Sequence, residues 1–324
     1  MRTFRLSIVL LAVLAAAAAA AADPLPSWHD RPVKAAILGW LAAVTDTTGP
    51  DHIPVPERIA VFDNDGTSWC ERPGYGPTDF QVDLARSLAA RGQIDPEAMP
   101  FKAWFADDRD ALRAFGWNEA YVRMNAAFAG MPVEAYRDSA RAWLARTVHE
   151  RFGVTHDRLY YPPMLELMRL LEAHAFQVWI VSGGAQDFVR SYSEEVIGIP
   201  PERVIGSWTM PVYRRNDDGT VTMVRGDTQT YNGHEHKPAN IEARIGRRPV
   251  FAAGNSNNDE PMSRYAVTGP RRGLAIWIHH DDGEREYAYG RPGRLGELCA
   301  EHPAAHEVSM DRDWVRVFAD GIGR

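Results

Sequence analysis

Cysteine and lysine are scarce in this sequence, and internal repeats are absent. The 324 residues include only two cysteines, Cys70 and Cys299, so the chain has no cysteine cluster of the kind that binds zinc. An oxidising compartment would permit the two thiols to pair, but they lie far apart in the sequence, and both a disulfide and two separate thiols remain open. Low complexity is confined to one run of alanines near the N-terminus.

Positive charge is also in deficit. The chain has 36 basic and 43 acidic residues and a formal net charge of −7, and its only lysines are Lys34, Lys102 and Lys237. Such an acidic chain does not favour nucleic acid or an anionic membrane as its main partner. An anionic substrate would therefore have to be held by locally placed positive charge.

Long apolar runs occur only at the N-terminus. Residues 1–22 begin with Arg2 and Arg5, continue with an apolar run and end in alanines that satisfy the A-x-A cleavage rule. This pattern predicts a signal peptide, cleavage before Asp23 and export of a soluble protein to the periplasm or the medium, with a net charge of −9 once both arginines are removed. An uncleaved anchor is the alternative. It is disfavoured because the run is short for a spanning helix and rich in weakly hydrophobic alanine.

The rest of the chain has the pattern of a globular α/β protein. Hydrophobic residues make up 45% of the sequence, enough for a proper core. Amphipathic helical patterns alternate with short apolar segments that are typical of strands buried on both faces. These segments are residues 58–63, 176–182, 250–254 and 274–279. The alternation predicts a Rossmann-like parallel sheet with helices on both faces.

Two intervals interrupt the alternation. Residues 74–161 show several amphipathic helical patterns and no good strand, which predicts an inserted, all-helical cap. Residues 205–231 have a turn signal between two β-rich arms, which predicts a small β-hairpin insertion. The α/β core would then consist of residues 23–73 and 162–324.

Polar residues gather where the predicted strands end. Ligands of open α/β sheets bind beyond the carboxyl ends of the strands, so we expect these side chains to meet in one pocket. They are Asp63 and Asp65 after the first strand, Ser182 and Gly183 after the second, Asn255 and Asp259 after the third, and Lys237 just before a short helix.

These residue types suit phosphoryl transfer, which needs a nucleophile, charge neutralisation and a proton for the leaving group. Asp63 can supply a carboxylate nucleophile, and Asp65 can protonate the leaving group and later activate water. The Ser182 hydroxyl and the Gly183 amide, expected at the start of a helix, can hold a phosphate, while Lys237 neutralises charge. The alternative is that the two aspartates only cap a turn, since Asp-Gly is a common turn pair.

In order and spacing, these motifs resemble those of the haloacid dehalogenase superfamily. They are DxDGT at 63–67, Ser-Gly-Gly at 182–184, Lys237 and Gly-Asn-Ser-x-x-Asp at 254–259. The chain looks most like the phosphoserine phosphatase-like branch with a helical cap after the first motif, which includes secreted phosphatases and relatives of phosphorylcholine phosphatase. The resemblance implies a phosphomonoesterase that acts on small phosphate esters through an aspartyl phosphate. It also implies that Asp63 and the main-chain carbonyl of Asp65 bind Mg²⁺, which prefers oxygen ligands.

The last motif departs from the family pattern. Many relatives have Gly-Asp where this chain has Gly254 and Asn255, and that aspartate is a magnesium ligand. An asparagine oxygen can still bind magnesium, and Asp259 could bind it directly, bind it through water, or orient Asn255. The resemblance therefore leaves open which of the two is the ligand, and we expect weaker affinity for the metal.

Two alternative functions are compatible with the same fold. A dehalogenase of the same superfamily would use Asp63 to displace halide, but a halide leaving group needs no acid, so Asp65 argues against it. A catalytically silent binding protein on this fold is the other alternative, and the intact motif residues argue against that. The sequence does not identify which phosphate ester is the substrate, nor the oligomeric state.

The surroundings of the site are harder to predict. We expect Trp69 and Arg72 to face the entrance and to contact substrate. For the tryptophans of the helical interval, helix packing is a commoner role than an aromatic cage; these are Trp104, Trp117 and Trp143. Residues 277–290 combine histidines, acids and tyrosines, and we expect them to form a solvated turn.

Overall fold

The computed structural model describes residues 23–290 and 292–322. The predicted signal peptide, residues 1–22, lies outside the described residues. Within the described part of the chain, no helix combines the length and the apolar character that crossing a membrane requires. Cys70 and Cys299 are both free, so they do not form the disulfide that the sequence left open.

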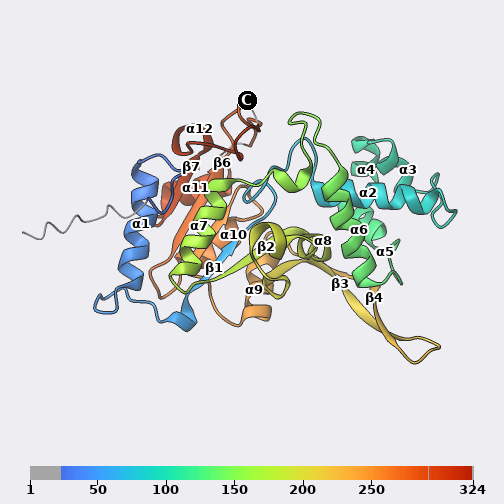
Figure 1. The fold of residues 1–324 in the computed structure, drawn as a ribbon, viewed down its shortest axis with the longest axis horizontal. Helices are drawn as coiled ribbons and strands as arrows, with labels where there is room; N and C mark the ends of the chain where they lie inside the picture. Colours follow the sequence, from blue (N-terminus) through green and yellow to red (C-terminus); the bar gives the residue numbers. More distant parts are fainter. Residues whose placement is uncertain (1–22, 291, 323–324) are drawn as a thin grey trace, which may run out of the picture.

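One mixed sheet forms the centre of the molecule (Figure 1). Its order among the described residues is β4-β3-β2-β1-β5-β6-β7, and every neighbouring pair is parallel except β3 and β4. The strands are β1 Ile59–Phe62, β2 Gln177–Ala185, β3 Val204–Arg215, β4 Val221–Thr230, β5 Phe251–Gly254, β6 Leu274–His279 and β7 Ala305–Ser309. The central position of β1 delivers Asp63 to the middle of the carboxyl edge.

Helices cover both faces of this sheet, because the strands are apolar on both sides. In β1, Ala60 and Phe62 belong to one hydrophobic cluster, whereas Ile59 and Val61 belong to another. The first cluster includes residues of α1 and α7, and the second includes residues of α9, α10 and α11. The helices of the core are α1 Pro32–Thr45, α7 Pro162–Ala173, α8 Gln186–Arg190, α9 His236–Ile245, α10 Glu260–Val267, α11 Arg294–Glu301 and α12 Met310–Asp313.

The interval between β1 and β2 is helical and lies to one side of the sheet (Figure 1). It has its own buried aromatic contacts, such as Phe80 against Tyr136 at 5.2 Å between ring centroids. Main-chain hydrogen bonds from Gly130 to Arg225 and from Arg225 to Met131 join it to β4. Its helices are α2 Gly76–Ala89, α3 Phe101–Phe105, α4 Arg109–Phe115, α5 Trp117–Ala126 and α6 Val133–Arg146.

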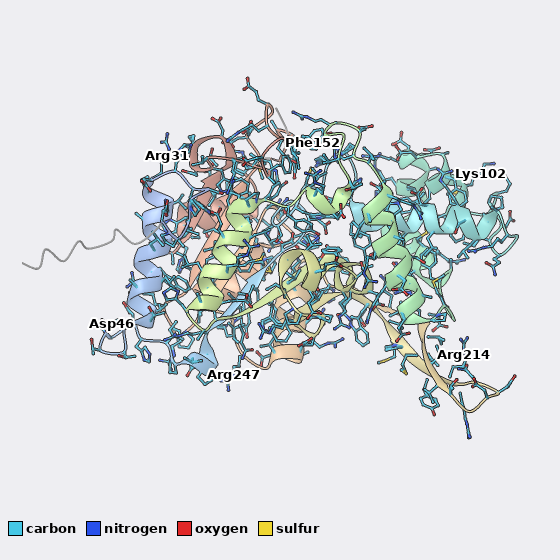
Figure 2. All side chains as sticks on the ribbon, viewed as in Figure 1. Arg31, Asp46, Lys102, Phe152, Arg214 and Arg247 are labelled. Carbon is cyan, nitrogen blue, oxygen red and sulfur yellow. The ribbon has the colours of Figure 1, made fainter. Side chains whose placement is uncertain are left out.

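Short helical turns complete the described part of the chain. They are η1 Val55–Glu57, η2 His156–Arg158, η3 Ser193–Ile197 and η4 Pro201–Arg203. Beyond the sheet, β3 and β4 continue as a projecting hairpin that carries Arg214 (Figure 2). The base of this hairpin is part of the main sheet, since Val204 and Ile205 pair in parallel with β2.

The predicted α/β fold is confirmed, and the predicted apolar segments correspond to β1, β2, β5 and β6. The sequence interpretation did not include α1 or β7. Strand β7 reads Ala-His-Glu-Val-Ser and contains no continuous apolar run, because its middle residues are partly exposed at the sheet edge.

Candidate active site

Asp63 is the first residue after β1, and its position is fixed by main-chain bonds. Its N–H donates to Ala253 O of β5 at 2.9 Å, and its carbonyl accepts from Ser68 Oγ at 2.8 Å. Asp63 and Asp65 are 6% and 8% exposed. Both carboxylates are thus nearly withdrawn from water, which is costly unless other groups compensate.

Lys237 supplies much of that compensation. Its Nζ lies 2.6 Å from Asp63 Oδ1, 2.6 Å from Asp259 Oδ1 and 2.8 Å from Val181 O, and the side chain is fully buried. Burial lowers the pKa of Lys237, but the carboxylates of Asp259 and Asp63 outweigh it and hold that pKa above its usual value. The lysine is therefore a fixed positive charge.

The other lysines lie elsewhere. Lys34 pairs with Asp23 and Asp30 beside α1, and Lys102 pairs with Glu97 at the far end of the helical interval (Figure 2). Lys237 is therefore the lysine that the fold brings to the carboxyl edge, as its position in the sequence indicates.

Asp259 organises the loop after β5. Its Oδ2 accepts from Asn255 N at 3.1 Å, Ser256 N at 3.0 Å and Ser256 Oγ at 3.1 Å, while Oδ1 accepts from Lys237. A Cβ at Gly254 would lie 2.3 Å from Asp259 Cβ, so only glycine allows this close approach. Both carboxylate oxygens of Asp259 are thus occupied by the protein.

Asp65 has a separate set of partners. Trp69 Nε1 donates to its Oδ1 at 2.9 Å, and Ser182 Oγ lies 3.3 Å from its Oδ2. Burial raises the pKa of Asp65, and the bond from Trp69 opposes that rise. The two aspartates therefore differ in electrostatic environment: Asp63 is bound to an ammonium, and Asp65 to neutral donors.

Trp69 is not at the entrance, so that prediction was wrong. Its side chain is fully buried and stacks on Tyr160 at 5.6 Å between ring centroids. Phe188 and Tyr192 also pack on it. The loop turns this tryptophan inward, and it holds Asp65 instead of contacting substrate.

Ser182 and Gly183 lie at the same edge, at the end of β2. Gly184 N donates to Ser182 Oγ at 2.9 Å, and Gly183 O accepts from Ser207 Oγ at 2.8 Å. Strand β2 continues to Ala185, and α8 begins only at Gln186 with five residues. The expected glycine position at a helix start was therefore wrong, and a helix dipole contributes little here.

The carboxylates outnumber the cations in this cluster. Asp63, Asp65 and Asp259 face a single ammonium from Lys237. Burial, and then the charge of Asp259, raise the pKa of Asp63 well above its usual range, with Lys237 opposing them. The excess negative charge favours an additional cation at this edge.

Asn255 lies against the loop after β1. Gly66 has φ +72°, and a Cβ there would lie 1.9 Å from Asn255 Nδ2, so the position requires glycine. Asn255 Nδ2 donates to Glu71 Oε1 at 3.1 Å. Glu71 is only 5% exposed, and burial raises its pKa while His280 opposes that rise. Glu71 was not among the residues that the sequence singled out.

The segment from Trp277 to Gly290 forms the expected solvated turn at Gly283 and Glu284, but much of the rest is buried. His280 is buried, with Nε2 2.7 Å from Gly66 O and Nδ1 3.2 Å from Glu286 Oε2. Tyr289 stacks on it at 4.2 Å between ring centroids. This segment supports the loop that carries Asp65. Its density of histidines, acids and tyrosines was the sequence signal that could have indicated this role.

A cavity of about 870 Å³ opens between the helical interval and the carboxyl edge. Gly183 and Gly184 line its core side. The helical side includes the three tryptophans for which packing was expected, Trp104, Trp117 and Trp143. Trp143 also donates to Asp83 Oδ2 at 2.8 Å. These side chains therefore form a cavity wall, and Arg72 lines the same cavity as predicted.

Oxygen atoms suitable for a metal ion remain open in this site. Within residues 23–290 and 292–322, no protein hydrogen bond occupies Asp63 Oδ2, Asp65 O or Asn255 Oδ1. The same residues contain no group of three or more His, Cys, Asp and Glu side chains arranged around a metal. One carboxylate, one carbonyl and one amide would not form such a group, yet all three are oxygen ligands that Mg²⁺ accepts.

Comparison with known proteins gives one family match. A family model described as haloacid dehalogenase-like hydrolase matches residues 60–264. The matched range extends from β1 into α10 and includes Asp63, Lys237 and Asp259. No curated protein matches the chain.

Solved structures share the fold at low sequence identity. A functionally unknown protein from Anaerococcus prevotii DSM 20548 is 15% identical, with a TM-score of 0.53 over 85% of this chain and 91% of that chain. A protein of unknown function from Bordetella pertussis Tohama I is 18% identical (TM-score 0.48, 78% and 98% coverage). A probable phosphoserine phosphatase from Vibrio cholerae is 12% identical (TM-score 0.41, 79% and 62% coverage). The first likeness shows the fold alone, and the other two are too distant to support an argument.

Proposed function

Since the chain belongs to the haloacid dehalogenase-like hydrolases, we propose that it is a magnesium-dependent phosphomonoesterase that acts on small phosphate esters through an aspartyl phosphate. One observation carries the proposal. Asp63 and Asp65 lie two residues apart yet have different partners, an ammonium for Asp63 and an indole N–H with a hydroxyl for Asp65. Two carboxylates in different environments can take the two roles that phosphoryl transfer requires.

Asp63 is the proposed nucleophile. Lys237 holds Oδ1 in place to attack phosphorus, which leaves Oδ2 for the metal ion. A bond forms between Oδ1 and phosphorus, the ester P–O bond breaks, and the departing alcohol takes a proton from Asp65. Asp65 then accepts a proton from water as the water oxygen attacks phosphorus. The Asp63 oxygen leaves, and inorganic phosphate and the free carboxylate are regenerated.

The phosphate oxygens have donors from two elements. Ser182 Oγ and the main-chain amide of Gly183 lie at the end of β2, and Lys237 brings positive charge from α9. Lys237 already contacts Asp63, so the same ammonium that holds the nucleophile also reduces repulsion between the carboxylate and an approaching phosphate. Phosphate binding would thus place phosphorus directly above Asp63.

Asp63, the carbonyl of Asp65 and Asn255 would hold Mg²⁺, because their open oxygens suit a hard cation. When bound, the ion supplies positive charge that offsets the excess of carboxylates and the charge of the phosphate. Asp259 has both oxygens occupied, so it serves as the residue that positions Asn255 and Lys237. Asn255 is thereby favoured over Asp259 as the direct ligand.

The size and position of the cavity support a small substrate. Its volume of about 870 Å³ is enough for a small phosphate ester. The helical interval forms one wall of the cavity and would exclude bulk water from the reaction. A dehalogenase is less well supported, because nothing in halide release would use the acid Asp65. We further propose export as the setting, from residues 1–22, with neither nucleic acid nor membrane as a partner.

Phosphate release tests the proposal. The protein beginning at Asp23 is incubated with a panel of small phosphate esters, with magnesium or with a chelator. We expect release that depends on magnesium and that Asp63→Asn and Asp65→Asn each abolish. Glu166→Gln is the control, since this carboxylate of α7 binds Ser27 and Arg316 far from the site. Full activity in either aspartate variant would refute the mechanism.

A further inference from the structure

Glu71 is a buried carboxylate that the proposed reaction does not use. It is 5% exposed, and in the described part of the chain no Lys, Arg or His nitrogen forms an ion pair with it within 4.0 Å. Arg72, its neighbour, instead stacks over the ring of Tyr289 at 4.3 Å from the centroid. A buried carboxylate without a paired cation is expensive, so its retention at this point of the site requires an explanation.

We propose that Glu71 and Asn255 act as one unit of the magnesium site, in which Glu71 orients the amide of Asn255 and supplies the negative charge that this neutral ligand lacks. The inference rests on the proposed function, because it concerns the metal of that same site. Glu71 is a positioning residue in this account: it acts on the metal through Asn255.

The hydrogen bond between the two residues decides the orientation of the amide. Asn255 Nδ2 donates to Glu71 Oε1 at 3.1 Å, and a carboxylate oxygen of Glu71 is the acceptor that this N–H₂ group requires. Oδ1 then faces away from Glu71 and has no protein partner in the part of the chain that the structure describes. With a neutral partner at position 71, the amide could rotate and turn its N–H₂ group toward the metal instead.

Gly66 brings this pair close to the rest of the proposed metal ligands. An ideal Cβ on Gly66 would lie 1.9 Å from Asn255 Nδ2 and 2.9 Å from Glu71 Cδ. Both side chains therefore rest on the main chain of the residue that follows Asp65. The Asn255–Glu71 contact and the Asp65 carbonyl are thus held by one short stretch of backbone.

Charge supports the same conclusion. The proposed ligands contribute one carboxylate, from Asp63, and that carboxylate already shares its charge with Lys237. His280, Tyr289 and Arg72 face Glu71 and favour its charged form, whereas Asp65 opposes it. A dication next to Asn255 would offset the repulsion between Glu71 and Asp65, and Glu71 would strengthen its binding as an outer-shell anion.

A double-mutant cycle on magnesium affinity tests this inference. Calorimetric titration with magnesium alone, without substrate, is applied to the wild type, Glu71→Gln, Asn255→Asp and the double variant. We expect Glu71→Gln to weaken magnesium binding by about 10- to 100-fold, the usual effect of losing an outer-shell partner. Glu166→Gln, which also removes a largely buried carboxylate, should leave the affinity unchanged.

The decisive quantity is the coupling between the two positions. The double variant exchanges the two roles, because the carboxylate now stands at position 255 and the amide at position 71 donates an N–H to it. The lost charge is thereby restored, so we expect the double variant to recover to within about threefold of the wild type. With Glu71 intact, Asn255→Asp would place two carboxylates about 3 Å apart. It should therefore improve magnesium affinity far less than the same substitution does in the Glu71→Gln background. It should also lower the melting temperature of the metal-free protein.

Several outcomes would overturn the inference. If Glu71→Gln lowers the melting temperature but binds magnesium as tightly as the wild type, Glu71 only supports the loop, and the proposed phosphatase stands. If Asn255→Asp changes the affinity by the same factor in both backgrounds, the two residues do not act as a unit. If the wild type binds no magnesium, this inference and the metal requirement of the proposed function fail together. Phosphate release that continues in the presence of chelator would show independently that the reaction needs no metal.

Discussion

Lys237 Nζ lies 2.6 Å from Asp63 Oδ1 at a point where the lysine side chain is wholly buried. Asp259 holds the same ammonium from the other side at 2.6 Å. The Lys237 ammonium thus holds the proposed nucleophile in place. The stability of the fold also depends on this ammonium, because a buried ion pair that loses one partner leaves an uncompensated charge.

Lys237→Met should therefore destabilise the protein and abolish activity. Loss of the ammonium leaves Asp63 and Asp259 buried without a counter-charge, and we expect the free energy of unfolding to fall by about 3–5 kcal/mol. Urea denaturation measures the change. Lys34→Met is the control, since Lys34 pairs with Asp23 and Asp30 away from the site. Adding Asp63→Asn to Lys237→Met should regain part of the stability and none of the activity. A double variant that is as strongly destabilised as Lys237→Met alone would contradict this.

Trp69→Phe should impair catalysis more than folding. Phenylalanine keeps the packing on Tyr160 but removes the N–H that binds Asp65 Oδ1. A hydrogen bond to a charged group is worth about 1.5–3 kcal/mol, so kcat/KM should fall about 10- to 100-fold. Because that bond lowers the pKa of Asp65, its loss should move the limb of the pH–rate profile that reports Asp65 to higher pH.

Trp40→Phe provides the matched control for that variant. Its indole N–H donates to Arg272 O, remote from Asp65. An unchanged pH–rate profile in both variants would show that Trp69 is not coupled to the acid–base group.

Stability should fall as pH rises through the titration of Asp79. Asp79 lines the cavity, where partial desolvation, and then the charges of the neighbouring Asp83 and Asp107, raise its pKa from 3.8 to about 6. The neutral form is thus preferred in the folded protein, so the stability it contributes is present below pH 4 and lost as pH rises through 6. Asp79→Asn should raise the melting temperature at pH 7 and leave it unchanged at pH 4. A larger gain at pH 4 than at pH 7 would have the wrong sign.

The tryptophans of the cavity should influence substrate binding more than chemistry. Trp117 lines the cavity, is 43% exposed and packs edge-on against Trp104 at 5.8 Å. Trp117→Ala removes contact area from the wall, so KM for the preferred ester should rise by about tenfold, equivalent to about 1.4 kcal/mol, with kcat little changed. Val122→Ala on exposed α5 surface is the control. A fall in kcat at constant KM would place Trp117 in the chemistry instead.

The parts of the molecule that could be predicted from sequence were those set by local pattern. The apolar run of β1 predicted a strand buried on both faces, and Asp63 and Asp65, which follow it directly, were predicted to lie at the carboxyl edge. Lys237 could be selected from its place in the motif order. These are features in which a short stretch of sequence determines both the element and the position of its side chains.

The parts that were missed depend on contacts between distant segments. Glu71 meets Asn255 across 184 positions, and His280 meets Gly66 across 214. Nothing in either local sequence specifies these contacts. Trp69 was expected at the entrance because it follows the loop of the proposed nucleophile, but the loop turns it into an aromatic cluster that exists only after α8 and Tyr160 have packed.

Trapping of the covalent intermediate tests the central claim most directly. The Asp65→Asn variant lacks the base for hydrolysis, so it should accumulate the aspartyl phosphate when given magnesium and a reactive aryl phosphate, followed by rapid acid quench. Peptide mass spectrometry should then find one phosphoryl group on Asp63 and none in Asp63→Asn. Phosphate release by the wild type together with no label on Asp63, or a label at another residue, would contradict the account.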